Sequence, residues 1–263
     1  MQRIISWNVA SIRARWPLLA DFLRQEQPDI VFLQEIKTTE EHFPFMEAQI
    51  EGYHAIISGQ KGYNGVAILS KKSLKNMKYS LKGFEDQARF IQAETEAGTI
   101  LISVYVPNGN PPVKNPEDTT RLKYKLQWMN ALNEHIQYLI KQGKTIIIGG
   151  DFNVIERDTD VYNPDLFRCG ALMCDSVRQS YAELGKAGLI NVVRSFNPLP
   201  HTYSFWDFQG GAWRLNHGIL LDALWITADL QVTNAQIYQN IRSKVGTSDH
   251  VPVGADIKYP LNL

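Results

Sequence analysis

Short apolar runs of strand length, several of which stop at a polar residue or a glycine, limit the fold of this chain most strongly. Runs rich in β-branched residues lie at 4–7, 30–33, 65–69, 99–106, 145–148, 223–226 and 251–257. Each has the length of a typical strand. The runs therefore predict a set of short strands whose polar ends lie at the edge of a sheet.

Three segments between these runs have a helical pattern: 16–27, 119–141 and 179–187. The longest has apolar residues at 122, 126, 129, 132, 136, 139 and 140, close to a 3.6-residue period. Strands mixed with helices predict a layered α/β or α+β fold. With 263 residues, 44% of them hydrophobic, and no linker-like stretch, we expect one domain over residues 1–263.

Two of the runs resemble each other. IISWN ends at Asn8, and IIIGGDFN ends at Asn153. Two similar half-domains would place both strand ends at the same edge, where functional groups often gather. Two unrelated buried strands that merely look alike explain the pattern equally well.

Charge and composition argue against a protein that coats nucleic acid non-specifically, a secreted protein and a membrane-spanning protein. Lys+Arg and Asp+Glu both number 27, so any nucleic-acid-binding surface must be local. The N-terminus lacks the pattern of a secretory signal, and no run approaches the roughly 20 apolar residues of a membrane span. We expect a cytoplasmic monomer that does not bind membranes. Cys169 and Cys174 are then more simply free thiols than a disulfide.

Five segments place a polar side chain directly after or within an apolar run. Each alone is typical of a turn or a helix cap, but together they predict a convergent pocket. They are SWN with Asn8, FLQEIK with Glu35 and Lys37, SVYVPNG with Tyr105 and Asn108, IIGGDFN with Asp151 and Asn153, and GTSDH with Asp249 and His250.

These side chains suit metal-assisted hydrolysis of a phosphodiester. Mg²⁺ prefers one or two carboxylates together with water and substrate phosphate. Glu35 is the natural first ligand, with Asn8 or Asp249 nearby. Asp151 and Asn153 can orient or deprotonate a water molecule.

A protonated His250 would stabilise the charge that builds on the phosphate, provided that a carboxylate orients it. Asp222 in the apolar segment ILLDALWI is the candidate, because a carboxylate among apolar residues is costly unless it is paired. The sequence has no GxSxG motif, no Walker loop and no Cys/His zinc spacing. This favours attack by water over a covalent intermediate.

Six segments, SWNVASIRAR, FLQEIK, GYNGVAIL, YVPNG, GGDFNV and SDHVPV, resemble the exonuclease III family of abasic-site endonucleases in the same order. The resemblance implies a four-layered α/β sandwich, with two packed mixed sheets flanked by helices. It also implies a Mg²⁺-dependent enzyme (Mn²⁺ is an alternative) that acts on double-stranded DNA. Such an enzyme cuts 5′ to abasic sites and removes nucleotides or blocking groups from damaged 3′ ends.

The resemblance also implies roles for individual residues. The metal would lie near Asn8, Glu35 and Asp249. The catalytic residues would be Tyr105, Asp151, Asn153, Asp222 and His250. Phosphate contacts would come from Lys37, Arg89, Asn108, Arg121 and Lys125. Phe205 and Trp206 would line the pocket for the baseless sugar, although ordinary core aromatics fit them equally well.

The chain departs from the family pattern near the expected substrate pocket. Leu220 stands where the family usually has Arg, Asn191 stands where Asp is common, and residues 163–174 lack the usual cationic and aromatic character. These departures leave the balance between incision and 3′ trimming open.

Two alternatives remain. One is a phosphoesterase of the same superfamily with a substrate other than DNA. The other is a catalytically silent DNA-binding relative, which would be expected to have lost one of Glu35, Asp151, Asp222 or His250. All four are present.

Overall fold

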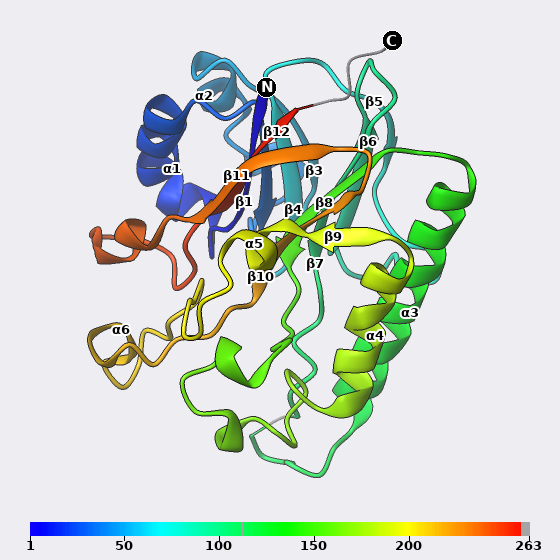
Figure 1. The fold of residues 1–263 in the computed structure, drawn as a ribbon. Helices are drawn as coiled ribbons and strands as arrows, with labels where there is room; N and C mark the ends of the chain where they lie inside the picture. Colours follow the sequence, from blue (N-terminus) through cyan, green and yellow to red (C-terminus); the bar gives the residue numbers. More distant parts are fainter. Residues whose placement is uncertain (112, 259–263) are drawn as a thin grey trace.

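A computed structural model describes residues 1–111 and 113–258. Residues 112 and 259–263 of the predicted domain lie outside this description. Two six-stranded mixed sheets pack face to face, and helices cover the outer face of each (Figure 1). The predicted four-layered sandwich is confirmed.

The first sheet has the strand order β11-β12-β1-β2-β4-β3. Only the central pair β1 and β2 is parallel. Its strands are β1 (Gln2–Asn8), β2 (Ile30–Gln34), β3 (His54–Ser58), β4 (Val66–Ser70), β11 (Gln231–Ile237) and β12 (Val253–Lys258).

The second sheet has the order β5-β6-β7-β8-β10-β9, and again only the central pair, β7 and β8, is parallel. Its strands are β5 (Lys75–Lys78), β6 (Phe90–Glu94), β7 (Ile100–Tyr105), β8 (Ile146–Asp151), β9 (Leu189–Asn191) and β10 (Asp222–Thr227).

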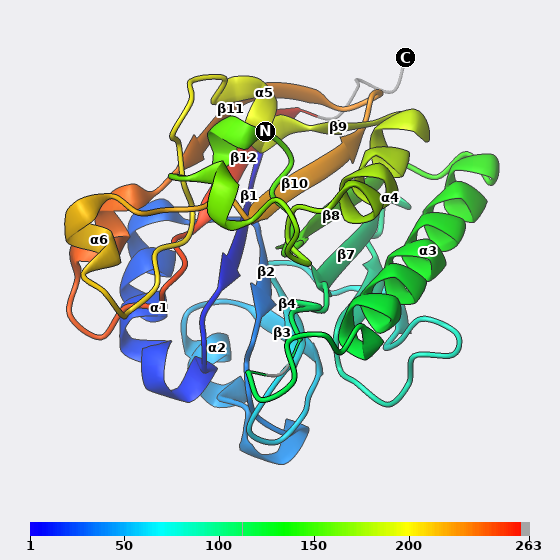
Figure 2. The ribbon, with the colours of Figure 1, turned by 90° about the horizontal axis from the view of Figure 1, so that it is seen from below.

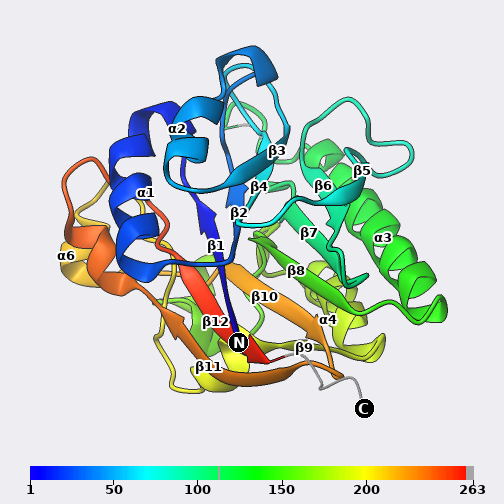
Figure 3. The same ribbon diagram turned by 90° about the horizontal axis from the view of Figure 1, so that it is seen from above.

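The helices form the two outer layers (Figure 3). The first sheet is covered by α1 (Ile12–Glu26) and α2 (Phe45–Ile50), and the second by α3 (Thr120–Lys141) and α4 (Asp175–Lys186). The short α5 (Val192–Phe196) and α6 (Ala212–Leu215) lie outside these layers. All three predicted helices exist, but α1 and α4 each begin four residues before the predicted start.

Among the described residues, no helix is long and apolar enough to cross a bilayer. Cys169 and Cys174 are free thiols.

The central strands are buried on both faces, and their side chains alternate between the helix side and the space between the sheets. In β1, Ile5 and Trp7 pack under the helices, whereas Ile4 points into the space between the sheets. In β8, Ile147 points into the same space. Successive side chains of a strand point to opposite faces, so an unbroken apolar run fills both.

The two sheets approach each other closely at Gly149. A Cβ at this position would lie 2.2 Å from Cδ2 of Phe32, which belongs to the facing sheet. No side chain fits there, so glycine is required by the packing rather than by its backbone conformation.

The ends of β1 and β8 meet at one end of the molecule. The Asn8 amide nitrogen lies 2.9 Å from Oδ2 of Asp151, although the two residues belong to different sheets. The shared edge suggested by the similar runs is therefore present. Figure 2 views the molecule from this end, where long connections leave the strands.

Candidate active site

A cleft of about 660 Å³ opens at this end of the sandwich. It brings together eight of the residues predicted from sequence: Glu35, Tyr105, Asn108, Asp151, Asn153, Phe205, Asp249 and His250. Their segments are spread over most of the chain, so the fold has gathered polar strand ends into one site.

Asn8 connects the acidic groups of the two sheets. Its buried amide donates to Oε1 of Glu35 and to Oδ2 of Asp151, both at 2.9 Å. Its carbonyl oxygen accepts from the backbone N–H of Ala10. The Asn8 side chain thus holds the two carboxylates with its amide donors and is itself held by the Ala10 N–H.

Glu35 is held as an anion. Burial alone would raise its pKa, but hydrogen bonds from Lys37 and Asn8 outweigh burial and lower the pKa below its usual value. The Lys37 ammonium lies 2.8 Å from Oε2 of Glu35. Two carboxylates in one cleft, Glu35 and the half-buried Asp249, supply the oxygen donors that a hard divalent cation prefers. This donor set fits the expected metal.

Three residues at or next to the site have a strained backbone. Glu35, Lys37 and Asn153 have φ values of 50°, 52° and 50°, in the left-handed region that non-glycine residues rarely adopt. Such conformations cost on the order of 1–3 kcal/mol each and persist where the surroundings enforce them. Of the three, Glu35 and Asn153 line the cleft, and they follow the ends of β2 and β8.

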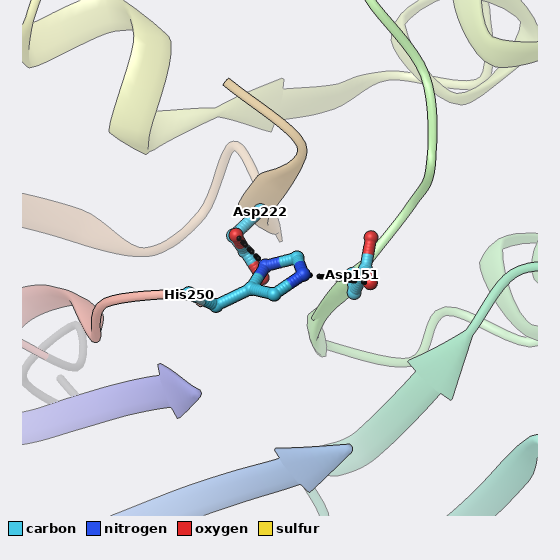
Figure 4. Close-up of side chains that lie close together, drawn as sticks. All are labelled: Asp151, Asp222 and His250. Carbon is cyan, nitrogen blue, oxygen red and sulfur yellow. Dashed lines mark hydrogen bonds and ion pairs between the residues drawn. The ribbon is translucent and has the colours of Figure 1, made fainter. Parts of the chain in front are cut away.

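His250 lies between two aspartates (Figure 4). Its Nδ1 is 2.8 Å from Oδ2 of Asp222, and its Nε2 is 3.6 Å from Oδ2 of Asp151. Burial alone would lower the pKa of His250, but the two carboxylates outweigh it and raise the pKa to about 10. The imidazole is therefore a cation at neutral pH, as predicted, and the buried carboxylate Asp222 has the partner that its position required. The hydroxyl of Ser204 donates to the same Asp222 oxygen at 2.6 Å.

Asp151 has a different character from Glu35. Complete burial raises its pKa to about 7, against the opposing attraction of His250. A carboxylate with a pKa near neutrality can both accept and release a proton. Asp151, Asp222 and His250 lie close enough together to hold a cation. The 2.8 Å contact of His250 Nδ1 with Asp222 is that of a hydrogen-bonded His–Asp pair, so we describe this group as a histidine held between two aspartates.

Tyr105 lines the cleft, and Arg89 packs against its ring. The Arg89 guanidinium stacks over the Tyr105 ring at 4.7 Å and donates to the Tyr105 carbonyl oxygen. Burial raises the pKa of Tyr105 well above 10, so its hydroxyl keeps its proton. A second groove of about 740 Å³ is lined by Arg89 and Arg121 and shares Asn108 with the first. The predicted phosphate contacts of Lys37, Arg89, Asn108 and Arg121 stay predictions.

Two substrate-binding predictions were wrong. Lys125 was expected to contact phosphate, but it is fully buried, and its Nζ donates to the carbonyl oxygens of Asn108, Asn153 and Ala171. Trp206 was expected to line the pocket. It is only 1% exposed, and it packs against Tyr203 and Trp213. Both side chains are enclosed by protein, so neither can reach a ligand.

The departures at Leu220 and Asn191 do not alter the cleft. Leu220 points into the apolar layer between the sheets, because its neighbours Ile219 and Leu221 take the cleft side. Asn191 caps α5 by accepting from the N–H of Arg194. Neither residue lines the cleft itself, whereas both neighbours of Leu220 do.

Sequence reasoning missed the apolar wall of the cleft. Tyr162 and His217 stack with their ring centroids 4.3 Å apart, and Phe167 packs edge-on against Tyr162. Ile219 and Leu221 complete this wall. The available signal was the apolar run Ile219–Leu221 before Asp222, in which alternate side chains point to the same side.

Comparisons with known proteins identify the family to which the chain belongs. Residues 5–250 match the Endonuclease/Exonuclease/phosphatase family. Exodeoxyribonuclease III of Haemophilus influenzae is 30% identical, over 97% of this chain and all of that protein. An AP endonuclease from Archaeoglobus fulgidus superposes with a TM-score of 0.91 at 30% identity, covering 99% of this chain and 100% of that one. The 3′ phosphatase NExo from Neisseria, bound to a product DNA hairpin, has a TM-score of 0.92 at 30% identity and covers 98% and 100%. The chain therefore belongs to the endonuclease/exonuclease/phosphatase family and is a hydrolase of the exonuclease III and AP endonuclease type.

Proposed function

We propose that this protein repairs double-stranded DNA by cutting the backbone 5′ to abasic sites and by removing nucleotides or blocking groups from 3′ ends. The observation that carries the proposal is the histidinium of His250, held between Asp222 and Asp151 in the cleft that also contains Glu35. This arrangement places a phosphate-binding cation beside a carboxylate that can take a proton.

The proposed reaction is hydrolysis by water. The water oxygen attacks phosphorus, and the bond from phosphorus to the 3′ oxygen of the preceding nucleotide breaks. Asp151 accepts the proton of the water, and the released 3′ oxygen takes a proton from solvent. His250 donates to a non-bridging phosphate oxygen, where negative charge increases in the transition state. Asp222 keeps the imidazole protonated and oriented.

Glu35 and Asp249 would hold a divalent cation, with Mg²⁺ as the expected ion and Mn²⁺ as an alternative. When bound, the cation would neutralise charge on the phosphate. The Lys37 ammonium forms an ion pair with Glu35 at 2.8 Å and so supplies a positive charge beside this carboxylate.

DNA is favoured over a small phosphorylated substrate by the shape of this face. The cleft continues through Asn108 into the second groove, which contains Arg89 and Arg121. A ligand longer than one nucleotide would reach both. Contacts to phosphates position DNA without reading its sequence and weaken with salt. We also propose that the protein is a cytoplasmic monomer, and the free thiols Cys169 and Cys174 are consistent with a reducing compartment.

The test uses two labelled duplexes that differ only by one abasic-site analogue, incubated with Mg²⁺ and then with a chelator. We expect cutting directly 5′ to the abasic site and slower shortening from the 3′ end, both abolished by the chelator. Shortening of both duplexes from the 3′ end without incision would limit the function to end processing. If neither duplex is cut in Mg²⁺ or Mn²⁺, the DNA proposal fails.

A further inference from the structure

Lys125 is a buried amino group on α3 whose hydrogen-bond partners are all backbone carbonyls, and burial lowers its pKa to about 7. It is 0% exposed, and its Nζ lies 2.5 Å from the Asn153 oxygen, 2.8 Å from the Ala171 oxygen and 3.2 Å from the Asn108 oxygen. Three carbonyls match the three N–H donors of an ammonium group. Within the described residues, no carboxylate forms an ion pair with it. Burying a cation without such a partner is costly, so its position needs an explanation.

The three carbonyls belong to three separate connections at the cleft. Asn108 follows β7, Asn153 follows β8, and Ala171 precedes α4. The packing around the lysine stem is close as well. A Cβ on Gly109 would lie 2.8 Å from Cδ of Lys125 and 3.1 Å from Cβ of Ala171. Lys125 is thus the point at which these connections are joined.

The contact with Asn153 connects Lys125 to Asp151, the proposed proton acceptor. The backbone N–H of Asn153 donates to Oδ1 of Asp151 at 3.0 Å. The side chain of Asn153 also accepts from the amide of Asn108 at 3.2 Å. Asn153 has a left-handed backbone, which must be enforced from outside. Two bonds hold Asn153 from outside: the Lys125 ammonium donates to its backbone carbonyl, and its own amide donates to the Val106 carbonyl.

We propose that Lys125 is a positioning residue, which sets the orientation of Asp151 and Asn108 by holding the connections after β7 and β8 and before α4 against α3. The catalytic part of this inference rests on the proposed function, whereas the joining of the three connections can be tested without it.

The test compares Lys125→Met, which keeps the length of the side chain but removes its donors, with Lys125→Arg. Lys123→Met is the matched control, because it makes the same substitution at an exposed position of α3. For abasic-site duplex in Mg²⁺, we expect kcat of Lys125→Met to fall about 10- to 100-fold with little change in KM, since misplaced catalytic groups slow the chemical step. Lys125→Arg should recover most of kcat, and Lys123→Met should match the wild type.

Hydrogen exchange gives a readout that does not depend on activity. We expect faster exchange at residues 152–155 and 169–173 in Lys125→Met, and not in Lys123→Met. If the wild type cuts no DNA, the proposed function fails, and exchange alone decides whether Lys125 joins the connections. If Lys125→Met does not fold, Lys125→Gln replaces it in the same assays. Its amide is polar but too short to reach all three carbonyls. Wild-type kcat in a folded Lys125→Met protein, or no recovery of kcat in Lys125→Arg, would overturn the proposal.

Discussion

Gly149→Ala tests the close approach of the two sheets. The added Cβ would lie 2.2 Å from Cδ2 of Phe32, 2.8 Å from Cγ of Phe32 and 3.1 Å from Cδ2 of Leu224. Carbon atoms do not approach within 3.0 Å without a shift, and a phenyl ring packed between sheets has little room to turn. Overpacking of this kind costs about 1–3 kcal/mol. For a protein of this size, Tm should fall by about 2–4 °C per kcal/mol.

Gly185→Ala is the matched control with the opposite expected sign. Gly185 lies in α4, and a Cβ there would approach only Trp225, at 3.8 Å, an ordinary contact. Replacing a helical glycine by alanine should stabilise the protein by about 0.4–1 kcal/mol. Urea unfolding followed by tryptophan fluorescence measures both variants.

Phe32→Leu in the Gly149→Ala background completes the test. If the clash is the cause, the double variant should be more stable than the sum of the single effects predicts, by roughly 0.5–3 kcal/mol. Wild-type stability of Gly149→Ala, or strict additivity in the double variant, would refute the packing argument.

Three further predictions concern single residues. Asp222→Asn should lower turnover by about 10²–10⁴, because a neutral partner no longer stabilises the imidazolium; NMR titration should then show the His250 pKa shifted down from about 10, and an unchanged value would contradict the assigned pairing. Glu35→Gln should raise the Mg²⁺ concentration needed for half-maximal activity by about 10-fold or more, whereas an unchanged Mg²⁺ dependence would remove Glu35 from the metal site. Burial lowers the pKa of His135 to about 4, so the unfolded chain binds more protons between that value and about 6.5, and stability should fall with falling pH across this window by at most about 1.4 kcal/mol per unit. His135→Gln should flatten this part of the pH–stability curve, and an identical curve in both proteins would mean that His135 is not held neutral.

Much of the candidate site could be predicted because strand ends and residue types are both visible in the sequence. Asp151 and His250 follow apolar runs, and the chemistry of a histidine and a carboxylate limits what they can do. Lys125 and Trp206 could not be placed in this way, since a residue type does not state its exposure. Lys125 nevertheless lies three residues after Leu122 and four before Met129, on the apolar face of its helix, and this spacing was a usable signal.

What the sequence by itself determined was the interior of each sheet. Every strand predicted from an apolar run, β1, β2, β4, β7, β8, β10 and β12, lies inside a sheet, where both faces are buried and apolar residues must be continuous. Of the inner strands, only β6 was missed, because its apolar residues are interrupted by Gln92.

The edges of the sheets and the assembly of the site were decided by the tertiary structure. The edge strands β3, β5, β9 and β11 carry polar and partly exposed side chains, so their extended form depends on hydrogen bonds to a neighbouring strand. The same holds for the contact of the Asn8 amide with Glu35 and Asp151. Only the packing of one sheet on the other brings Asp151 within reach of Asn8, because no local pattern relates residues 143 positions apart.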